Sequence, residues 1–384
     1  MSEDKSGLSA AGAGETTAPA VFWDGYGLDA PRSGVFVHAR HLADALVKRG
    51  IRPVVVGHSS CMALSTELEY LALQDPSFFA AIARLKPVWP ARVAQRVEAA
   101  RPANRDRVIL HGLSNINIPW LGRHERLRRV VTVHDAIPLL EPAAVSRAYY
   151  WQLRAILPRV LRAADRIICV SRWTRNTLTV LFPDCESKTV VIPNGVPSLE
   201  ITSLPEKTDT IRALYVARWE PYKRLDMACN LVRKAAGGLR LSLVTDAKGV
   251  DFCYENAGDL IAVGHLVVLT GVGEQALREL YQSVDVYLHT SRLEGFCLPA
   301  AEALAVGRPL VYEEGSGIDE VSGREVSVPV TAGASPAIWL AALEKAASLG
   351  RTPEFPRLLS RHHAGLSSWG QAAAALEKLY NELS

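Results

Sequence analysis

The chain has 384 residues, of which 48% are hydrophobic and 22% are charged, with a formal net charge of +3. This length fits two domains of average size, and so apolar a composition excludes a disordered chain. No run of about 18 apolar residues occurs, which excludes a transmembrane helix, and Met1 to Ala20 lack the basic start and apolar stretch of a signal peptide. We therefore expect a cytoplasmic protein with a disordered tail at residues 1–19.

The six cysteines are scattered along the sequence without close pairs, at Cys61, Cys169, Cys185, Cys229, Cys253 and Cys297. Zinc ribbons and disulfide frameworks need closely spaced cysteines, so both are excluded. A reducing cytosol is the expected setting.

In the first half of the chain, short β-rich runs alternate with segments of helical periodicity. The expected strands lie at 20–23, 52–56, 107–110, 130–133 and 166–170. The expected helices lie at 35–48, 90–100 and 145–163. Strand, helix and strand in alternation predict a parallel sheet with helices on both faces.

The same alternation restarts after a turn at 193–197 and a polar stretch at 200–210. The second set of strands is expected at 189–192, 212–216, 239–244, 266–270, 286–289 and 309–312, the first of these preceding the turn. Helices are expected at 225–236, 253–262, 274–283 and 298–305. We predict an α/β protein with two Rossmann-like domains, 20–198 and 199–365, facing across a cleft. Ligands bind at the carboxyl ends of such strands, so the cleft is the expected site.

The strongest local signal is the segment from Ser291 to Ala305, which leads from a strand through a glycine turn into a helix. Glu294 lies in the turn and Glu302 one turn inside the helix, so each carboxylate offers two acceptor oxygens to sugar hydroxyls. The turn and the helix start consist of Gly295, Phe296, Cys297 and Leu298, and their amides offer a site for phosphate. A surface glutamate and a glutamate that supports the helix start are the plainer interpretation.

Two cations lie where the strand at 212–216 gives way to the next helix: Arg218 and Lys223. Together they are suited to neutralise a diphosphate and stabilise it as a leaving group. No Asp-x-Asp occurs in the sequence, so a carboxylate pair for a divalent metal is not evident. Two solvated surface charges are the alternative.

Two weaker signals lie in the first half. His134 follows the strand at 130–133, where a side chain faces the cleft and can bond a sugar hydroxyl. Gly34 opens the helix at 35–48 and leaves amides available for phosphate or acceptor. A lone histidine is more often structural, and such glycine loops are common.

In this order, the four signals resemble the family 4 glycosyltransferases of GT-B fold over about residues 20 to 384. The family's first-loop glycine matches Gly34, and its His-Asp pair matches His134 and Asp135. Its Asp-Arg-Ile-Ile-x-Val-Ser and Pro-Asn-Gly-Val runs appear at 165–171 and 193–196.

In the second half, the family's Arg and Lys match Arg218 and Lys223, and its Glu-x7-Glu element matches Glu294 and Glu302. The family's Gly-Gly-x-Pro-Glu stretch reads Ser-Gly-Ile-Asp-Glu at 316–320. The segment 366–384 resembles the family's last helix, which crosses back to the first domain.

The resemblance implies that a sugar is transferred from a nucleotide-sugar donor with retention of its anomeric configuration, without a metal or other cofactor. It implies that Arg218 and Lys223 hold the donor diphosphate. Glu302 would bind the ribose hydroxyls, Glu294 the donor-sugar hydroxyls, and His134 the sugar near the reacting carbon. Arg218, Lys223, Glu294 and His134 are thus the expected catalytic residues.

The sequence is most like mannosyltransferases of bacterial surface-polysaccharide assembly, which makes GDP-mannose the first donor expected and UDP-GlcNAc or UDP-glucose the second. A glycan or a lipid-linked oligosaccharide is the expected acceptor. A non-catalytic GT-B scaffold subunit is the alternative outside enzymes, although the charges of Arg218, Lys223 and Glu294 are all retained. A nicotinamide-dependent oxidoreductase and a glycoside hydrolase explain these residues less well.

Basic residues are concentrated in the first half, where residues 1–200 hold 25 Lys and Arg against 18 Asp and Glu. Two segments, 76–107 and 145–162, interleave them with aromatic residues, which suits an anionic membrane surface or an anionic lipid-linked acceptor. A packed helix with a solvated arginine face is the alternative, and for 145–162 it is the favoured one. The excess is too mild for nucleic-acid binding. His38, His41, His362 and His363 are expected to be isolated surface histidines rather than metal ligands.

Overall fold

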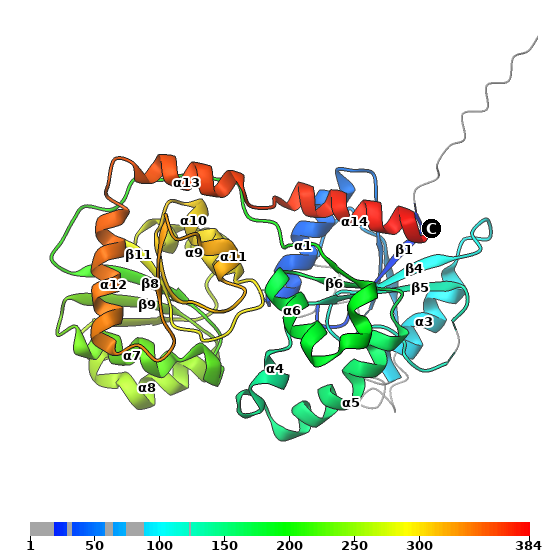
Figure 1. Ribbon diagram of the computed structural model, residues 1–384, viewed down its shortest axis with the longest axis horizontal. Helices are drawn as coiled ribbons and strands as arrows, with labels where there is room; N and C mark the ends of the chain where they lie inside the picture. Colours follow the sequence, from blue (N-terminus) through cyan, green and yellow to red (C-terminus); the bar gives the residue numbers. More distant parts are fainter. Residues whose placement is uncertain (1–18, 29–32, 58–63, 74–87, 123) are drawn as a thin grey trace, which may run out of the picture.

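The computed structural model describes residues 19–28, 33–57, 64–73, 88–122 and 124–384. Residues 1–18 of the expected tail, Cys61 and the aromatic and basic residues at 76–87 lie outside these ranges. Two lobes lie side by side along the long axis of the molecule, each built on a parallel sheet (Figure 1). The predicted α/β architecture of two Rossmann-like domains is confirmed.

The first sheet has seven strands in the order β3-β2-β1-β4-β5-β6-β7. They are β1 (Val21–Asp24), β2 (Val54–Gly57), β3 (Tyr70–Ala72), β4 (Val108–Gly112), β5 (Leu127–Val133), β6 (Arg166–Cys169) and β7 (Thr189–Val191). Every residue of the central strands β1 and β4 is buried, because helices cover both faces of a parallel sheet. This double burial is why these strands appear in the sequence as short apolar runs.

The second sheet has six parallel strands in the order β10-β9-β8-β11-β12-β13. They are β8 (Ile211–Val216), β9 (Leu239–Val244), β10 (Leu266–Leu269), β11 (Val286–His289), β12 (Leu310–Glu313) and β13 (Ser327–Val330). The chain builds outward from β8 in one direction and from β11 in the other. A crevice therefore forms beyond the carboxyl ends of these two neighbouring strands.

The helices of the first lobe are α1 (Gly34–Val47), α3 (Val88–Ala100), α4 (Ile137–Leu140), α5 (Arg147–Ala163) and α6 (Arg172–Leu181), with 3-10 turns η2 (Pro142–Ala144) and η3 (Pro183–Lys188). Those that follow are η4 (Pro221–Lys223), α7 (Leu225–Lys234), α8 (Ala247–Ala262), α9 (Glu274–Gln282), α10 (Leu298–Ala305), α11 (Asp319–Ser322), α12 (Pro336–Leu349), α13 (Phe355–Ala364) and α14 (Trp369–Leu383). Among the described residues, no helix combines the length and apolar character needed to span a bilayer.

Several elements were not predicted, namely β3, β13, α4, α11, α12 and α13, and two further helices also differ from the prediction. α8 begins at Ala247, six residues before the predicted start at Cys253, because Asp246 caps it by accepting a hydrogen bond from the Gly249 amide at 3.0 Å. α6 was not predicted at all. Only Thr174 and Leu178 of α6 are buried, so few apolar side chains mark this helix in the sequence.

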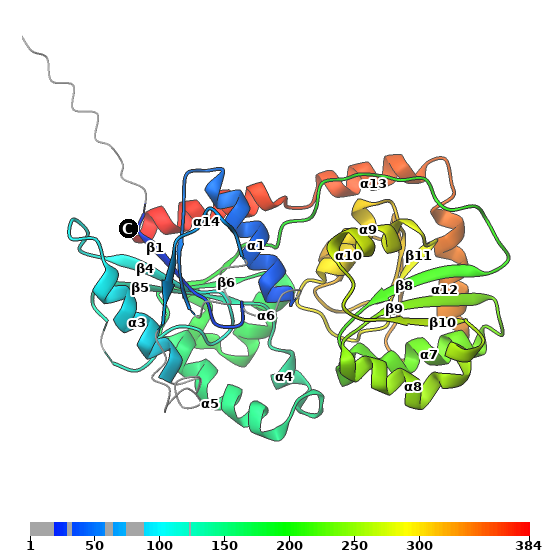
Figure 2. The same cartoon turned by 180° about the vertical axis from the view of Figure 1, so that it is seen from behind.

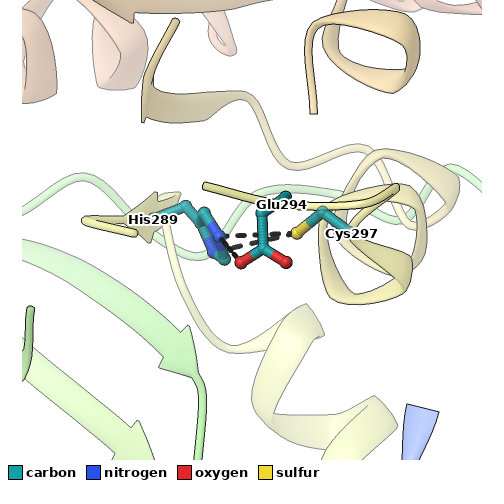
Figure 3. Close-up of side chains that lie close together, drawn as sticks. All are labelled: His289, Glu294 and Cys297. Atoms are coloured by element: carbon teal, nitrogen blue, oxygen red, sulfur yellow. Dashed lines mark hydrogen bonds and ion pairs between the residues drawn. The ribbon is translucent and has the colours of Figure 1, made fainter. Parts of the chain in front are cut away.

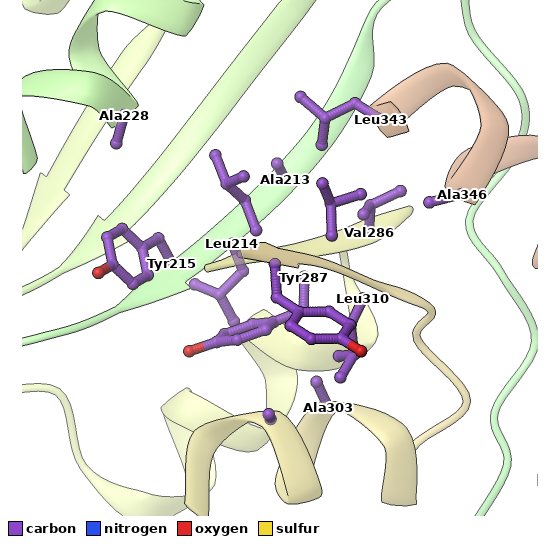
Figure 4. Packing of buried hydrophobic residues seen from close by; sticks show 14 of the residues in the cluster. Ala213, Leu214, Tyr215, Ala228, Val286, Tyr287, Ala303, Leu310, Leu343 and Ala346 are labelled. Atoms are coloured by element: carbon purple, nitrogen blue, oxygen red, sulfur yellow. The ribbon is translucent and has the colours of Figure 1, made fainter. Parts of the chain in front are cut away.

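The largest apolar core lies in the second lobe, around the central strands β8 and β11 (Figure 4). Tyr215 and Tyr287 come from these two strands, and Leu343 and Ala346 pack against them from α12. Both tyrosine side chains are fully buried. The core therefore fixes the two strands whose carboxyl ends border the crevice.

The last helix, α14, packs against α1 of the first lobe although it follows the whole second lobe in sequence (Figures 1 and 2). Its Tyr380 hydroxyl accepts a hydrogen bond from the Trp23 indole at 3.0 Å and lies 2.6 Å from His111 Nδ1. All three side chains are buried. The contact ties the carboxy-terminal segment to the middle of the first sheet.

Candidate active site

The loops that follow β8 and β11 meet in the crevice of the second lobe. Lys223 ends the 3-10 turn η4 after β8, and Glu294 lies in the loop after β11. The Lys223 ammonium donates to Glu294 Oε1 at 2.6 Å, and both side chains are largely buried. Two residues that the sequence placed in separate motifs thus form one ion pair.

A third side chain binds the same carboxylate oxygen. His289, the last residue of β11, has its Nε2 2.6 Å from Glu294 Oε1 (Figure 3). Since a carboxylate can only accept, His289 donates from Nε2. Sequence reasoning missed His289, although a histidine at the last position of a predicted buried strand was a signal for it.

The ion pair is ionised throughout the physiological pH range. Burial by itself would raise the pKa of Glu294, but the Lys223 ammonium and the His289 imidazole together hold this pKa at about 2. Burial likewise opposes the charge of Lys223, and the Glu294 carboxylate nevertheless raises the pKa of that ammonium above its usual value. Burial lowers the pKa of His289, which is therefore neutral.

Hydrogen bonds from neighbouring side chains hold the backbone of the turn that contains Lys223. The Tyr215 hydroxyl donates to the Lys223 carbonyl at 2.6 Å, and the Thr290 hydroxyl donates to the Arg224 carbonyl at 3.0 Å. Arg224 has a left-handed conformation, with φ of 53°, and its guanidinium pairs with Glu313 at 2.6 Å. These contacts fix Lys223 at the mouth of α7.

Cys297 lies next to the ion pair at the start of α10. It has a φ of 75°, and its Sγ lies 3.6 Å from His289 Nε2. His289, Glu294 and Cys297 offer three potential metal ligands within 4.8 Å of one another (Figure 3). Lys223 already binds Glu294 Oε1, and burial raises the pKa of the Cys297 thiol. A divalent cation would have to displace that ammonium and deprotonate the thiol.

Glu302 lies on α10, and the Tyr281 hydroxyl donates to its Oε2 at 2.8 Å. Burial raises the pKa of Glu302 to about 7, against the opposing effect of that hydrogen bond. Glu302 therefore changes its charge near neutral pH, unlike Glu294. The two glutamates, which look alike in the sequence, have different electrostatic roles.

In the first lobe, His134 follows β5 and is held by neighbouring backbone and side chains. Its Nε2 donates to the Leu113 carbonyl at 2.8 Å, and its amide donates to Asn115 Oδ1 at 2.9 Å. Burial lowers the pKa of His134, so the imidazole is neutral. With the proton on Nε2, Nδ1 is an acceptor.

The His134 loop and the Glu294 loop touch across the two lobes. A Cβ added at Gly295 would lie 2.0 Å from the His134 carbonyl oxygen and 3.1 Å from Asp135 Cβ. No side chain larger than hydrogen fits there. Burial raises the pKa of Asp135, and the nearby Lys223 ammonium opposes this shift. The structure therefore places the loop that carries His134 against the loop that carries Glu294, and Glu294 pairs with Lys223.

Family comparisons agree with this two-lobe division. The model of Glycosyltransferase Family 4 matches residues 32–198, and the model of Glycosyl transferases group 1 matches residues 199–349. Both halves of the chain therefore match glycosyltransferase family models. Its first lobe is the family 4 domain, and its second lobe, with Lys223 and Glu294, is the group 1 domain.

Similar proteins include an uncharacterized glycosyltransferase of Methanocaldococcus jannaschii, 28% identical over 182 residues, which cover 42% of this chain and 45% of that protein. The D-inositol 3-phosphate glycosyltransferase of Geodermatophilus obscurus is 24% identical over 76% of this chain and 69% of its own length. The chain thus spans about half of the first relative and about two thirds of the second. In fold, Anabaena HepE in complex with UDP and glucose is similar, with a TM-score of 0.68, 17% identity and coverage of 94% and 99% of the two chains.

Other predicted residues of this glycosyltransferase lie outside the ion-pair cluster. Arg218 is exposed near the start of the loop that follows β8. Gly34 opens α1, but the Ser33 hydroxyl already accepts from the Phe36 amide at 3.1 Å. The expectation that the amides at this helix start lack partners is therefore wrong for the amide of Phe36. Phe296 and Cys297 are buried in the apolar core of the second lobe.

The expectation of isolated surface histidines is wrong for three of the four. His38 is buried, with Nδ1 2.7 Å from Asn194 Oδ1. His362 and His363 donate from Nε2 to the Val321 and Pro197 carbonyls at 2.6 and 2.8 Å. Only His41 is exposed, and its ring stacks on Trp369 with centroids 5.0 Å apart. These partners come from distant segments, so no local pattern showed them.

Two surface hollows lie away from this site. One, of about 290 Å³, is lined by residues that include His124, Arg129 and Asp165, and the other, of about 420 Å³, by residues that include Ile201 and Arg351. Neither is lined by His134, Lys223 or Glu294. With Gly295 against the His134 carbonyl, the two lobes are in contact at the site.

Proposed function

We propose that the chain transfers a hexose from a nucleotide sugar to a glycan or lipid-linked acceptor, with retention of the anomeric configuration. GDP-mannose is the first donor proposed, in bacterial surface-polysaccharide assembly. The observation that carries the proposal is the Lys223–Glu294 pair at the carboxyl ends of β8 and β11, with the His134 loop against it. A cation, a carboxylate and a neutral histidine are what a sugar diphosphate requires of its site.

The ion pair indicates how the donor is received. When the bond between the sugar and the diphosphate breaks, negative charge moves onto the diphosphate, and a fixed ammonium in a dry site stabilises it. Lys223 therefore exchanges its carboxylate partner for a phosphate oxygen. Glu294 is then free to accept from donor-sugar hydroxyls, while His289 keeps its 2.6 Å hydrogen bond and holds the carboxylate in place.

The remaining roles follow from exposure and protonation. Arg218 is exposed and free to fold over the diphosphate as a second cation. Glu302, when ionised, accepts from the two ribose hydroxyls. His134 offers Nδ1 as an acceptor for a hydroxyl of the donor sugar, since Nε2 is bound to the Leu113 carbonyl.

A UDP-sugar is the second donor candidate. Anabaena HepE, similar in fold, holds UDP and glucose, which supports uridine as an alternative base. The name of the Geodermatophilus relative makes D-inositol 3-phosphate an acceptor to test beside lipid-linked glycans.

The proposed lipid-linked acceptor is supported by the outer face of α5. The helix packs its apolar face on the first lobe through Leu153, Leu157 and Val160, as expected. Trp151, however, is 62% exposed and lies beside the Arg154 guanidinium, 6.0 Å from the ring centre. No acidic residue occurs on α5. An exposed tryptophan among arginines suits an anionic lipid headgroup, so we place peripheral membrane contact here.

Thermal stabilisation by nucleotides tests the proposal directly, because a ligand that binds the folded state raises its melting temperature. GDP, UDP and ADP are compared at equal concentrations, and the matching nucleotide sugars are then assayed for release of the nucleotide with and without acceptor. We expect GDP to give the largest shift. A scaffold subunit would show no shift with any nucleotide and no turnover, and that result would refute the proposed function.

A further inference from the structure

The first turn of α6 is capped from two sides. Within the first lobe, the Ser171 hydroxyl accepts from the Thr174 amide at 2.9 Å. The two preceding amides, of Arg172 and Trp173, both donate to the Glu320 carboxylate, at 3.1 and 2.7 Å. A helix leaves these first amides without partners of its own, and Glu320 supplies them.

Glu320 belongs to the other lobe, because it lies on α11. Its carboxylate meets the positive end of the α6 dipole, and the Arg172 guanidinium lies 3.5 Å from it. The side chain of Glu320 is only 19% exposed. One lobe therefore caps a helix of the other through charge-assisted hydrogen bonds.

Thr174 makes a second link between the lobes. Its hydroxyl lies 3.1 Å from the His134 carbonyl oxygen and 3.3 Å from the Gly295 carbonyl oxygen, and it is placed to donate to both. Thr174 is completely buried. A single hydroxyl thus touches the two loops that carry His134 and Glu294.

The Glu320 segment packs directly against the Glu294 loop. The Gly317 amide donates to the Glu294 carbonyl at 2.8 Å, and a Cβ at Gly317 would lie 2.2 Å from the Gly295 carbonyl oxygen. Glu320, which caps α6 from α11, therefore lies only three residues along the chain from Gly317, the residue that binds the Glu294 loop.

We propose that Glu320 and Thr174 form a closure latch, a pair of positioning residues that hold Glu294 and Lys223 against His134. The proposal rests on the proposed function, since its purpose is to assemble that site. In the closed structure Gly295 lies against the His134 carbonyl, so a donor enters when the lobes separate. When the lobes separate, the hydrogen bonds of Glu320 and Thr174 to the opposite lobe break and these groups bind water instead. The same hydrogen bonds form again as the lobes close over the bound donor.

Small-angle X-ray scattering of the full chain tests the latch without substrate. Glu320→Ala and Thr174→Val remove the two links, and we expect both variants to have a larger radius of gyration than the wild type. Glu325→Ala is the matched control, because Glu325 is an exposed carboxylate five residues from Glu320. Thr174→Ser keeps the hydroxyl and should restore the wild-type curve. Circular dichroism confirms that each variant is folded.

Kinetics supply the second measurement. We expect kcat/KM of Glu320→Ala to fall roughly tenfold, as expected for loss of a hydrogen-bonded charge. The affinity for free GDP should stay unchanged, since the proposed nucleotide contacts lie within the second lobe. If the scattering curves of Glu320→Ala and Thr174→Val superimpose on that of the wild type, the latch is refuted. If the wild type itself turns over no nucleotide sugar, the proposed function fails, and scattering alone still decides the latch.

Discussion

Lys223 and Glu294, 71 residues apart in the sequence, form a 2.6 Å ion pair at the carboxyl ends of neighbouring strands β8 and β11. His289 binds the same oxygen of Glu294. The pair is therefore a preformed arrangement in which each charge is held by its partner.

Removal of the cation should abolish most turnover. We expect Lys223→Ala to lower kcat/KM roughly 10²–10³-fold, the range for loss of one group that stabilises developing negative charge. The fold should persist, because His289 still donates to Glu294. Initial rates and circular dichroism are the measurements. Arg233→Ala is the control, since Arg233 pairs with exposed Asp259 on the surface of α7 and α8. A folded Lys223→Ala enzyme with the native rate would contradict the assignment.

Donor binding should depend on pH through Glu302. Its pKa is raised to about 7, so the carboxylate proposed to accept from ribose hydroxyls is lost as the pH falls through that value. We expect KM for the donor to fall roughly tenfold between about pH 6 and about pH 8, as the ionised fraction rises. Glu302→Gln should show a flat profile. A wild-type KM that does not change over this range would show that ionisation of Glu302 has no part in binding.

The buried contacts of Tyr380 should contribute to stability. In Tyr380→Phe, the Trp23 indole N–H and His111 Nδ1 lose their partner inside the first lobe. A buried polar group left unpaired costs about 1–3 kcal/mol, so the midpoint of urea unfolding should fall by a corresponding amount. Tyr254→Phe, at an exposed position of α8, is the control and should leave the midpoint unchanged. Equal midpoints for both variants would contradict this.

Turnover should not require a divalent metal. The Lys223 ammonium occupies the Glu294 oxygen on which a cation beside His289 and Cys297 would depend. Dialysis against EDTA should leave the rate unchanged, and added Mn²⁺ or Mg²⁺ should not raise it. Strict dependence on added Mn²⁺ would overturn the role assigned to the cationic side chains.

Membrane contact should depend on Trp151. We expect the wild type to float with vesicles that contain phosphatidylglycerol at low salt and to be released at high salt, because exposed charges are screened. Trp151→Ala should float less, whereas Ile338→Ala, an exposed apolar side chain on α12, should behave as the wild type. Failure of the wild type to float would remove the membrane proposal.

Part of the second lobe was predicted closely, although β13, α11, α12 and α13 were not predicted. Three segments, 239–244, 286–289 and 298–305, match β9, β11 and α10 residue for residue. They are short and bounded by polar residues or turns, and most of their buried residues are apolar, so burial leaves a direct trace in the sequence. α6 leaves only the local cap of Ser171, because the partner of its first two amides, Glu320, is 147 residues away from Trp173.

The candidate site divides in the same way. Glu294, Lys223 and His134 stand at strand ends and could be found from local patterns. His289 as a partner of Glu294, the different protonation of Glu302 and the contact of Gly295 with His134 depend on distances between segments.

The sequence by itself determined the two parallel sheets and the residue types at their carboxyl ends, because apolar runs and turn residues act over a few neighbouring positions. The tertiary structure decided which charges meet, which are buried and which lobe caps which helix. Those properties come from the dielectric and the distances set by packing, which connect residues far apart in the chain.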